Sequence, residues 1–251
     1  MSVPHDYFDE PVAATYDDDT TDEFSEATIA ATVDVLAALA GTGSALELAV
    51  GTGRIAVPLA ERGVPVAGID LSQAMVARLM AKRDDIPVTI GDIATTTVDG
   101  TFSLVYLVFN TVMNLLTQDA QVACFRNAAA HLEDGGVFVV ECLVPELRLL
   151  PPGATVVPFH VSDERYGFDE YDVAQQGVVS HHLALVDGEW TRASIPFRYV
   201  WPAELDLMAA MAGMRLRDRW SGWDRTPFTS ESRTHVSVWE KLPAVSRRSS
   251  P

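Results

Sequence analysis

The chain has 251 residues, of which 48% are hydrophobic and 21% charged, an ordinary globular composition that excludes a disordered chain, a collagen and a coiled coil. Its formal net charge is −17, because 35 acidic residues outweigh 18 basic ones. So few basic groups disfavour sequence-independent binding to nucleic acids, whose phosphates must be neutralised, and anionic membrane surfaces would repel the chain. We therefore expect neither a nucleic-acid nor a membrane partner.

The acidic charge is concentrated at the start, since no Lys or Arg precedes Arg54. The opening residues MSVPHDYFDE lack the features of a signal peptide, and no apolar run is long enough for a transmembrane helix. Cys124 and Cys142 lie in apolar stretches, which predicts buried thiols rather than a disulfide framework or a metal site. These features lead us to expect a cytoplasmic protein without a bound metal.

Residues 1–24 form an acidic, polar segment that carries four aromatic residues, Tyr7, Phe8, Tyr16 and Phe24. This composition is typical of a solvated arm. The aromatic residues are also compatible with an arm that closes over a ligand. The sequence leaves both interpretations open.

After this segment, the pattern alternates between helices and apolar strands. Ser25 is the expected N-cap of a first helix, because apolar residues recur at helical spacing from Ile29 to Ala40. Five apolar strands and four helical segments follow. The expected strands are 45–50, 65–69, 87–90, 102–109 and 137–143, and the expected helices are 55–61, 72–82, a weaker stretch before Phe102, and 118–132 with Thr117 as its N-cap.

Such alternation requires crossover connections, which predicts an α/β fold with a parallel sheet covered by helices on both faces. The runs LVYLVF and VFVVECLV are nearly continuous in apolar residues. Strands of this kind are typical of sheets buried on both sides.

The alternation stops after Pro145. Extended runs follow at 155–160, 177–186 and 190–200, and Asp187-Gly188 is a turn dipeptide typical of a β-hairpin. A helix beginning at Pro202 and two strands at 214–220 and 234–242 are expected next. The predicted division is an acidic arm (1–24), a cofactor-binding α/β core (25–150), a β-rich lid (151–200), a closing helix and strands (201–242) and a tail (243–251).

Glycines and acids mark the predicted carboxyl ends of the strands, where α/β sheets bind ligands. Gly51 and Gly53 let a ligand approach the backbone after the first strand. Asp70 offers two acceptor oxygens after the second strand, which suit paired ribose hydroxyls. Asp92 follows the third strand and suits an exocyclic amine such as that of adenine. Glu47 lies inside an apolar strand, where a carboxylate is costly without a partner.

The glycine turn alone is compatible with more than one cofactor. Gly51-x-Gly53-x-x-Ala56 matches the dinucleotide fingerprint, and Asp70 lies at nearly the right distance for the ribose of NAD. Three features disfavour NAD: the acid inside the first strand, the aspartate after the third strand and the helix that precedes the first strand.

Three motifs in order, ELAVGTGR, VAGIDLS and IGDI, resemble those of the class I methyltransferases that use S-adenosylmethionine. The resemblance covers residues 25–143 and reaches the end of the chain. There, WPAELDLM, AGM and HVSVW resemble the final helix and last two strands of small-molecule members, which often carry a β-rich lid in the place of residues 151–200. It implies a Rossmann-like seven-stranded sheet with helices on both faces and an antiparallel β lid inserted after the fifth strand.

The resemblance also implies the roles of the motif residues. The turn from Glu47 to Gly53 would contact the methionine part of S-adenosylmethionine, Asp70 would hold the ribose hydroxyls, and Ala49 stands where the family has its first glycine. Leu71 and Met75 would flank adenine, and Asp92 and Ile93 would contact its edge. Phe109 and Asn110 would lie beside the sulfonium, and Tyr16 would close the site. The implied cofactor-binding residues are Tyr16, Glu47, Ala49, Gly51, Gly53, Asp70, Leu71, Met75, Asp92, Ile93, Phe109 and Asn110.

Methyl transfer from a sulfonium is a direct displacement, so positioning supplies much of the rate. A general base is required only where the acceptor must lose a proton. The candidates for contact with the acceptor are His181, His182 and Asn114, for which packing or capping roles remain open. His181 and His182 are adjacent in an expected strand and therefore point to opposite faces. Further candidates, for an apolar pocket or for the core, are Trp201, Trp220, Trp223 and Phe228, while Glu141 in the fifth strand needs a partner.

The expected methyl acceptor is an O or N atom of a small molecule. The Asn-Pro-Pro-Tyr signature of DNA-methylating members is absent, and the corresponding stretch begins Phe109-Asn110. A lid would also restrict access for a protein substrate. The alternative function is a non-catalytic binding module with a methyltransferase fold.

Overall fold

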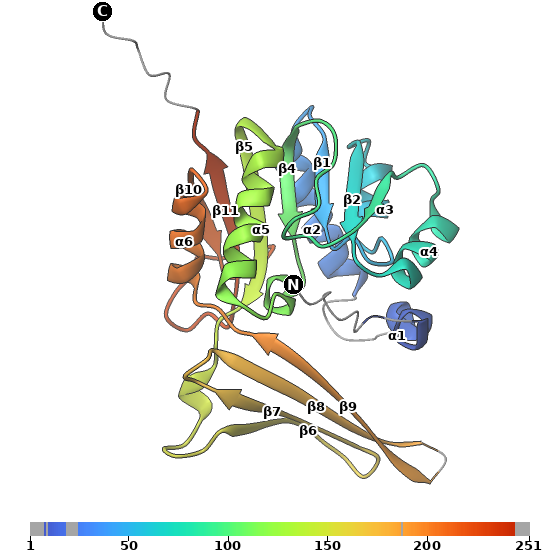
Figure 1. Ribbon diagram of the computed structural model, residues 1–251, viewed down its shortest axis with the longest axis vertical. Helices are drawn as coiled ribbons and strands as arrows, with labels where there is room; N and C mark the ends of the chain where they lie inside the picture. Colours follow the sequence, from blue (N-terminus) through green and yellow to red (C-terminus); the bar gives the residue numbers. More distant parts are fainter. Residues whose placement is uncertain (1–7, 9, 19–24, 187, 244–251) are drawn as a thin grey trace, which may run out of the picture.

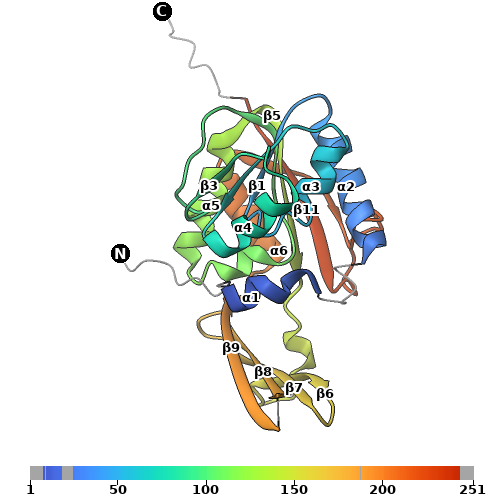
Figure 2. The same ribbon diagram turned by 90° about the vertical axis from the view of Figure 1, so that its right-hand side faces the viewer.

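The computed structural model describes residue 8 and residues 10–18, 25–186 and 188–243. A seven-stranded sheet carries helices on both faces, and a separate four-stranded antiparallel sheet projects from one end of it (Figures 1 and 2). The predicted fold class, a Rossmann-like methyltransferase sheet with a β lid inserted after the fifth strand, is confirmed.

The strand order in the large sheet is β10-β11-β5-β4-β1-β2-β3. Strands β1 to β5 run parallel, and β11 is antiparallel to both of its neighbours. The order reverses between β1 and β4, where the carboxyl ends of the strands leave room for a ligand. The strands are β1 (Ala45–Leu48), β2 (Val66–Asp70), β3 (Val88–Ile90), β4 (Phe102–Leu107), β5 (Leu132–Leu143), β10 (Met214–Trp220) and β11 (Thr234–Lys241).

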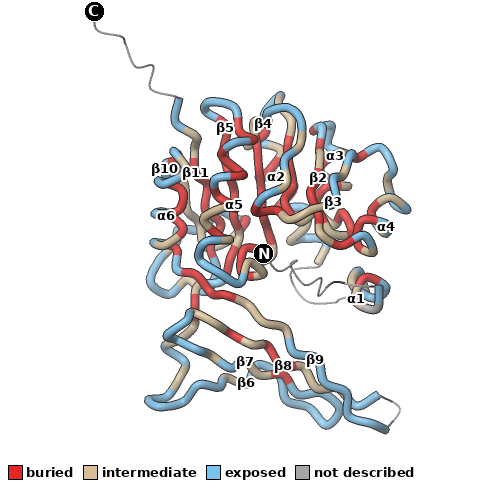
Figure 3. The backbone as a smooth tube through the Cα atoms, viewed as in Figure 1, coloured by how far each residue is buried: buried red, intermediate tan, exposed pale blue. Residues whose placement is uncertain are grey.

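Alternate residues of the strands face two separate helical layers. In β4, Leu104 and Tyr106 pack with the layer of α2, α3 and α4, whereas Val105 and Leu107 pack with α5 and α6. The central strands β1 and β4 are buried along almost their whole length, whereas the edge strands β3 and β10 are largely exposed or half-buried (Figure 3). The helices are α2 (Glu26–Ala40), α3 (Ala56–Glu61), α4 (Gln73–Lys82), α5 (Gln118–His131) and α6 (Pro202–Met211).

Side chains cap three of these helices at their N-termini. Ser25 and Thr117 accept N–H bonds from Thr28 and Ala120, which confirms both predicted N-caps, and Ser72 caps α4. The prediction of a weaker helical stretch before Phe102 was wrong. The backbone after β3 forms a single turn about Asp92, because the run of threonines and Gly100 has little tendency to extend it.

The lid contains one strand more than the extended runs predicted. Strand β7 has the sequence RYGFDEYD, in which charged residues interrupt any apolar run. Strands β8 and β9 pair as the predicted hairpin, although Asp187 of its turn lies outside the described residues. The lid strands are β6 (Val156–Val161), β7 (Arg165–Asp172), β8 (Gly177–Val186) and β9 (Glu189–Arg198).

A buried polar cluster joins the end of β9 to the helices of the core. The Arg198 guanidinium donates to Gln121 and Gln176, and it forms an ion pair with Glu204 at 2.8 Å. This cluster fixes the base of the lid against α5 and α6.

Both cysteines are buried and free, as predicted, and burial raises the pKa of each thiol to about 12. Within the described ranges, none of the helices is long and apolar enough to cross a membrane.

Candidate cofactor site

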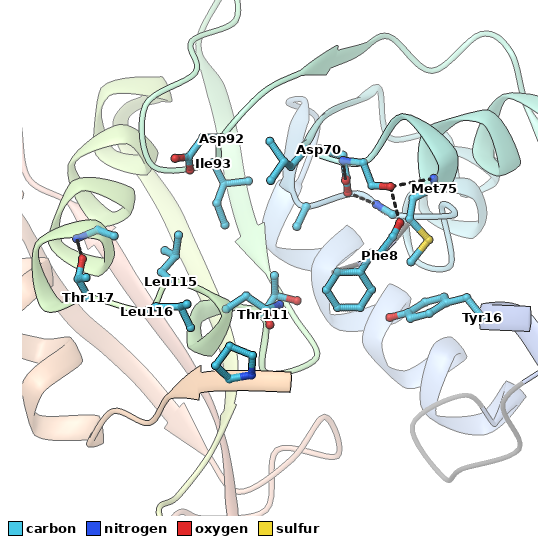
Figure 4. A pocket seen from close by; sticks show the side chains of 17 residues that line it. Phe8, Tyr16, Asp70, Met75, Asp92, Ile93, Thr111, Leu115, Leu116 and Thr117 are labelled. Carbon is cyan, nitrogen blue, oxygen red and sulfur yellow. Dashed lines mark hydrogen bonds between the residues drawn. The ribbon is translucent and has the colours of Figure 1, made fainter. Parts of the chain in front are cut away.

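A cavity of about 370 Å³ lies where β1, β2, β3 and β4 end (Figure 4). Eight of the residues predicted to act at the site line it: Tyr16, Ala49, Gly51, Asp70, Leu71, Met75, Asp92 and Ile93. The catalytic candidate Asn114 lines it as well. The sequence therefore predicted much of one wall of this cavity.

Asp70 joins the glycine turn to the start of α4. Its Oδ2 accepts the Gly51 N–H at 2.7 Å, and its Oδ1 accepts the Ser72 N–H at 2.8 Å. The side chain is buried and its carboxylate borders the cavity. Each carboxylate oxygen has a second lone pair, so the group can also accept bonds from paired hydroxyls.

The turn after β1 has left-handed backbone at three positions. Gly51 and Gly53 have φ values of 56° and 81°, and Ala49 has a φ of 59°. A Cβ on Gly53 would lie 2.9 Å from the Leu79 side chain, so only glycine fits there. Ala49 adopts the same left-handed conformation, which costs an alanine about 1 kcal/mol relative to glycine. This cost is small enough for an alanine to occupy the position where the family has a glycine.

The far end of the cavity combines apolar walls with one carboxylate. Ile93 and Met75 are buried, and Leu71 lies beside them on the wall. Asp92 accepts the Ala94 N–H at 2.8 Å through Oδ1, which orients its carboxyl group at the cavity edge. The walls suit a flat, apolar ring with a polar rim.

Phe8 and Tyr16 line the cavity on the side away from Asp92 (Figure 4). The Phe8 and Tyr16 rings meet edge to face with centroids 6.2 Å apart. Glu10 pairs with Arg78 at 2.5 Å, and Asp17 pairs with Lys82 at 2.6 Å. The described part of the arm, including α1 (Glu10–Thr15), lies against α4. Tyr7 and Phe24 lie outside the described residues.

Four of the residues predicted to contact the cofactor, Glu47, Gly53, Phe109 and Asn110, are outside the cavity wall formed by the described residues. Glu47 is buried in the layer of α2, α3 and α4, where it accepts hydrogen bonds from the Tyr106 hydroxyl at 2.9 Å and from the Ala56 N–H. Burial raises its pKa to about 8. Glu47 therefore has the partners that its position in β1 required.

Phe109 and Asn110 hold the segment that follows β4. Both have a φ of 59°. Glu141 accepts the Phe109 N–H through Oε2 and the Trp223 indole N–H through Oε1, each at 2.9 Å, while Asn110 accepts the Leu143 N–H at 2.7 Å. The partners that Glu141 needed are thus the Phe109 backbone N–H and the Trp223 indole. Together with the Asn110 bond to Leu143, these hydrogen bonds fix the start of the short helix η3 (Thr111–Asn114).

The two lid histidines point to opposite faces, as predicted. The His181 ring lies 4.8 Å from that of Phe168, and the His182 ring lies 5.3 Å from that of Phe159. Neither is among the described residues that line the cavity.

The aromatic residues near the end of the chain do not share one pocket. Trp201 and Phe228 line a shallow groove, Trp223 is buried, and the Trp220 ring lies 5.1 Å below the Arg225 guanidinium.

Several lining residues were not predicted as ligand contacts. Most come from the segment after β4, and one comes from the lid. They are Phe8, Ser72, Thr111, Leu115, Leu116, Thr117, Ala120 and Pro196. The apolar pair Leu115-Leu116, which follows η3 in the segment between β4 and α5, was the available signal, whereas nothing near Pro196 in the sequence indicates its place.

Residues 45–136 match the methyltransferase domain family. A methyltransferase, CcbJ from Streptomyces caelestis, is 35% identical in sequence and superposes with a TM-score of 0.82, over 92% of this chain and 96% of that one. The chain belongs to the class I S-adenosylmethionine-dependent methyltransferases. It is an enzyme that uses S-adenosylmethionine to methylate small molecules, which rules against the non-catalytic alternative.

Two further relatives are informative. The cypemycin N-terminal methyltransferase of a Streptomyces species is 29% identical over 201 residues, covering 78% of this chain and 82% of that protein. CalS10, an amino pentose methyltransferase of Micromonospora echinaspora solved with S-adenosylmethionine bound, shares the fold at 23% identity with a TM-score of 0.69, over 95% of this chain and 99% of that one.

Proposed function

We propose that the enzyme methylates a nitrogen atom of its small-molecule acceptor and that S-adenosylmethionine occupies the cavity of Figure 4. The observation that carries the cofactor's placement is the pair of carboxylates, Asp70 and Asp92, on the wall of one apolar slot. Asp70 accepts the ribose hydroxyls, and Asp92 accepts the adenine amine. Leu71, Met75 and Ile93 flank the ring.

The methionine part extends toward the turn at Ala49 and Gly51, where backbone approaches the cavity without a bulky side chain. When bound, S-adenosylmethionine supplies a methyl group on a sulfonium, which is already activated for displacement. Thr111 and Asn114 line the cavity at the end of β4 and border the path of an incoming nucleophile. Tyr16 and Phe8 close the opposite side and exclude water.

Nitrogen is favoured over oxygen because one relative is named as the N-terminal methyltransferase of cypemycin and another as an amino pentose methyltransferase. An uncharged amine carries a nucleophilic lone pair, so it needs no base at the moment of transfer.

Matched acceptors test the choice of atom. Amino sugars and short peptides would be incubated with the enzyme and S-adenosylmethionine beside counterparts in which hydroxyl replaces the amine, and the products analysed by mass spectrometry. Methylation of amines alone is expected. Methylation confined to the hydroxyl counterparts would overturn the assignment to nitrogen.

A further inference from the structure

A second cavity, of about 500 Å³, lies between the lid and the core. The short helix η3 separates it from the cofactor cavity: Thr111 and Asn114 line the first, whereas Met113 and the preceding Asn110 line the second. Adjacent residues of one short segment therefore line both cavities. The described lining residues are Asn110, Met113, Leu143, Val144, Pro145, Glu146, Asp169, Tyr171, Val178, Ser180, Phe197, Tyr199, Arg233 and Thr234.

One face of the lid forms the outer wall of this cavity. Asp169 pairs in register with Ser180, and Tyr171 pairs with Val178, which is itself opposite Phe197. The Tyr171 and Tyr199 rings lie 5.9 Å apart. The wall thus combines aromatic rings with a single carboxylate from β7.

The Asp169 carboxylate on this wall forms no ion pair with a lysine or arginine among the described residues. At the rim, Glu146 pairs with Arg233 at 2.6 Å. Burial raises the pKa of Asp169, and a hydrogen bond from Ser180 together with attraction to His182 and His181 partly opposes that rise. The His182 Nε2 lies 3.2 Å from the Ser180 hydroxyl oxygen, and burial and the nearby Arg165 lower the pKa of His182.

We infer that this second cavity holds the part of a methyl acceptor that carries a basic amine, distinct from the uncharged nitrogen that takes the methyl group, and that Asp169 is the residue that recognises this charged amine. The inference rests on the proposed function. A partly desolvated carboxylate gains most from a cation that completes its hydrogen bonds, and the faces of Tyr171 and Tyr199 attract the same charge. An anionic acceptor would meet the carboxylate, and a neutral alcohol would leave it without a counter-charge. Asp169 is thus a specificity-determining residue.

Two probes of equal size and different charge, benzylamine and benzyl alcohol, test this inference. Each would be titrated calorimetrically into enzyme saturated with S-adenosylhomocysteine. The wild type should bind the amine about ten-fold or more tightly than the alcohol, and Asp169→Asn should remove the preference. The control is Glu170→Gln, because Glu170 is on the opposite face of β7, beside His181, and should leave the preference unchanged.

The same titrations separate the two proposals. Equal binding of the probes to the wild type, no detectable amine binding up to the solubility limit, or a preference that survives in Asp169→Asn would overturn the role of Asp169. Binding of S-adenosylhomocysteine to Asp169→Asn at wild-type affinity shows that the variant is folded. If the wild type failed to bind S-adenosylhomocysteine, the cofactor site itself would be in error.

Discussion

Replacing Glu47 by Gln should make the stability of the folded protein less sensitive to pH. Glu47 is 4% exposed, and its pKa rises from 4.5 to about 8 on folding because burial disfavours the charged carboxylate. Between these values the unfolded chain releases a proton that the folded chain keeps, so stability falls as pH rises from about 4.5 to about 8. A shift of this size corresponds to up to about 5 kcal/mol, at about 1.4 kcal/mol per pKa unit.

The assay is urea unfolding of the wild type and Glu47→Gln at a series of pH values across this window. The glutamine carbonyl can still accept the Tyr106 hydroxyl, and the variant has no carboxyl group at position 47 to titrate. Its stability relative to the wild type should therefore increase with pH and level off above about 8. Exposed Glu133→Gln serves as the control. A difference between wild type and Glu47→Gln that stays constant over the window would refute the reasoning.

Two other substitutions test contacts that hold segments around the cofactor site in place. Asp17→Asn removes the charge that pairs with Lys82, so S-adenosylhomocysteine should dissociate faster in stopped-flow measurements, and added salt should shrink the difference from wild type; an unchanged rate would show that the arm does not retain the ligand. In Glu141→Gln the side-chain amide has only one oxygen, so its NH₂ group faces one of the two N–H donors, Phe109 or Trp223, and that hydrogen bond is lost. The free energy of unfolding should fall by about 1–3 kcal/mol. The midpoint of thermal unfolding should fall by roughly 2–10 °C, and an unaltered midpoint would contradict the assigned bonds.

The residues at strand ends were predictable because a parallel sheet brings the carboxyl ends of its strands to one edge. Asp70 and Asp92 are 22 positions apart in sequence, yet both line the same cavity, as their places after β2 and β3 implied. Glu47 shows the limit of this reasoning. Its position in β1 required a partner, but the sequence did not reveal that its side chain bonds to Tyr106, in the layer of α2, α3 and α4, and does not line the cavity.

Contacts that depend on tertiary packing left no local signal. Pro196 reaches the cavity only because the cluster around Arg198 holds β9 against the core. Phe8, by contrast, was among the aromatic residues compatible with an arm that closes over a ligand, and it reaches the cavity because residues 8 and 10–18 lie along α4. Strand β7 was missed for a different reason: its charged residues include Asp169, which faces a cavity instead of a hydrophobic core.

The central claim is that S-adenosylmethionine lies between Asp70 and Asp92, and one titration tests it most directly. S-adenosylhomocysteine would be titrated calorimetrically into the wild type, Asp92→Asn and the control Asp99→Asn, whose side chain is exposed. The amide introduced by Asp92→Asn can still accept the Ala94 N–H through Oδ1, but it turns a donor toward the adenine amine. The account predicts roughly ten- to hundred-fold weaker binding to Asp92→Asn alone. Wild-type affinity in Asp92→Asn would contradict it.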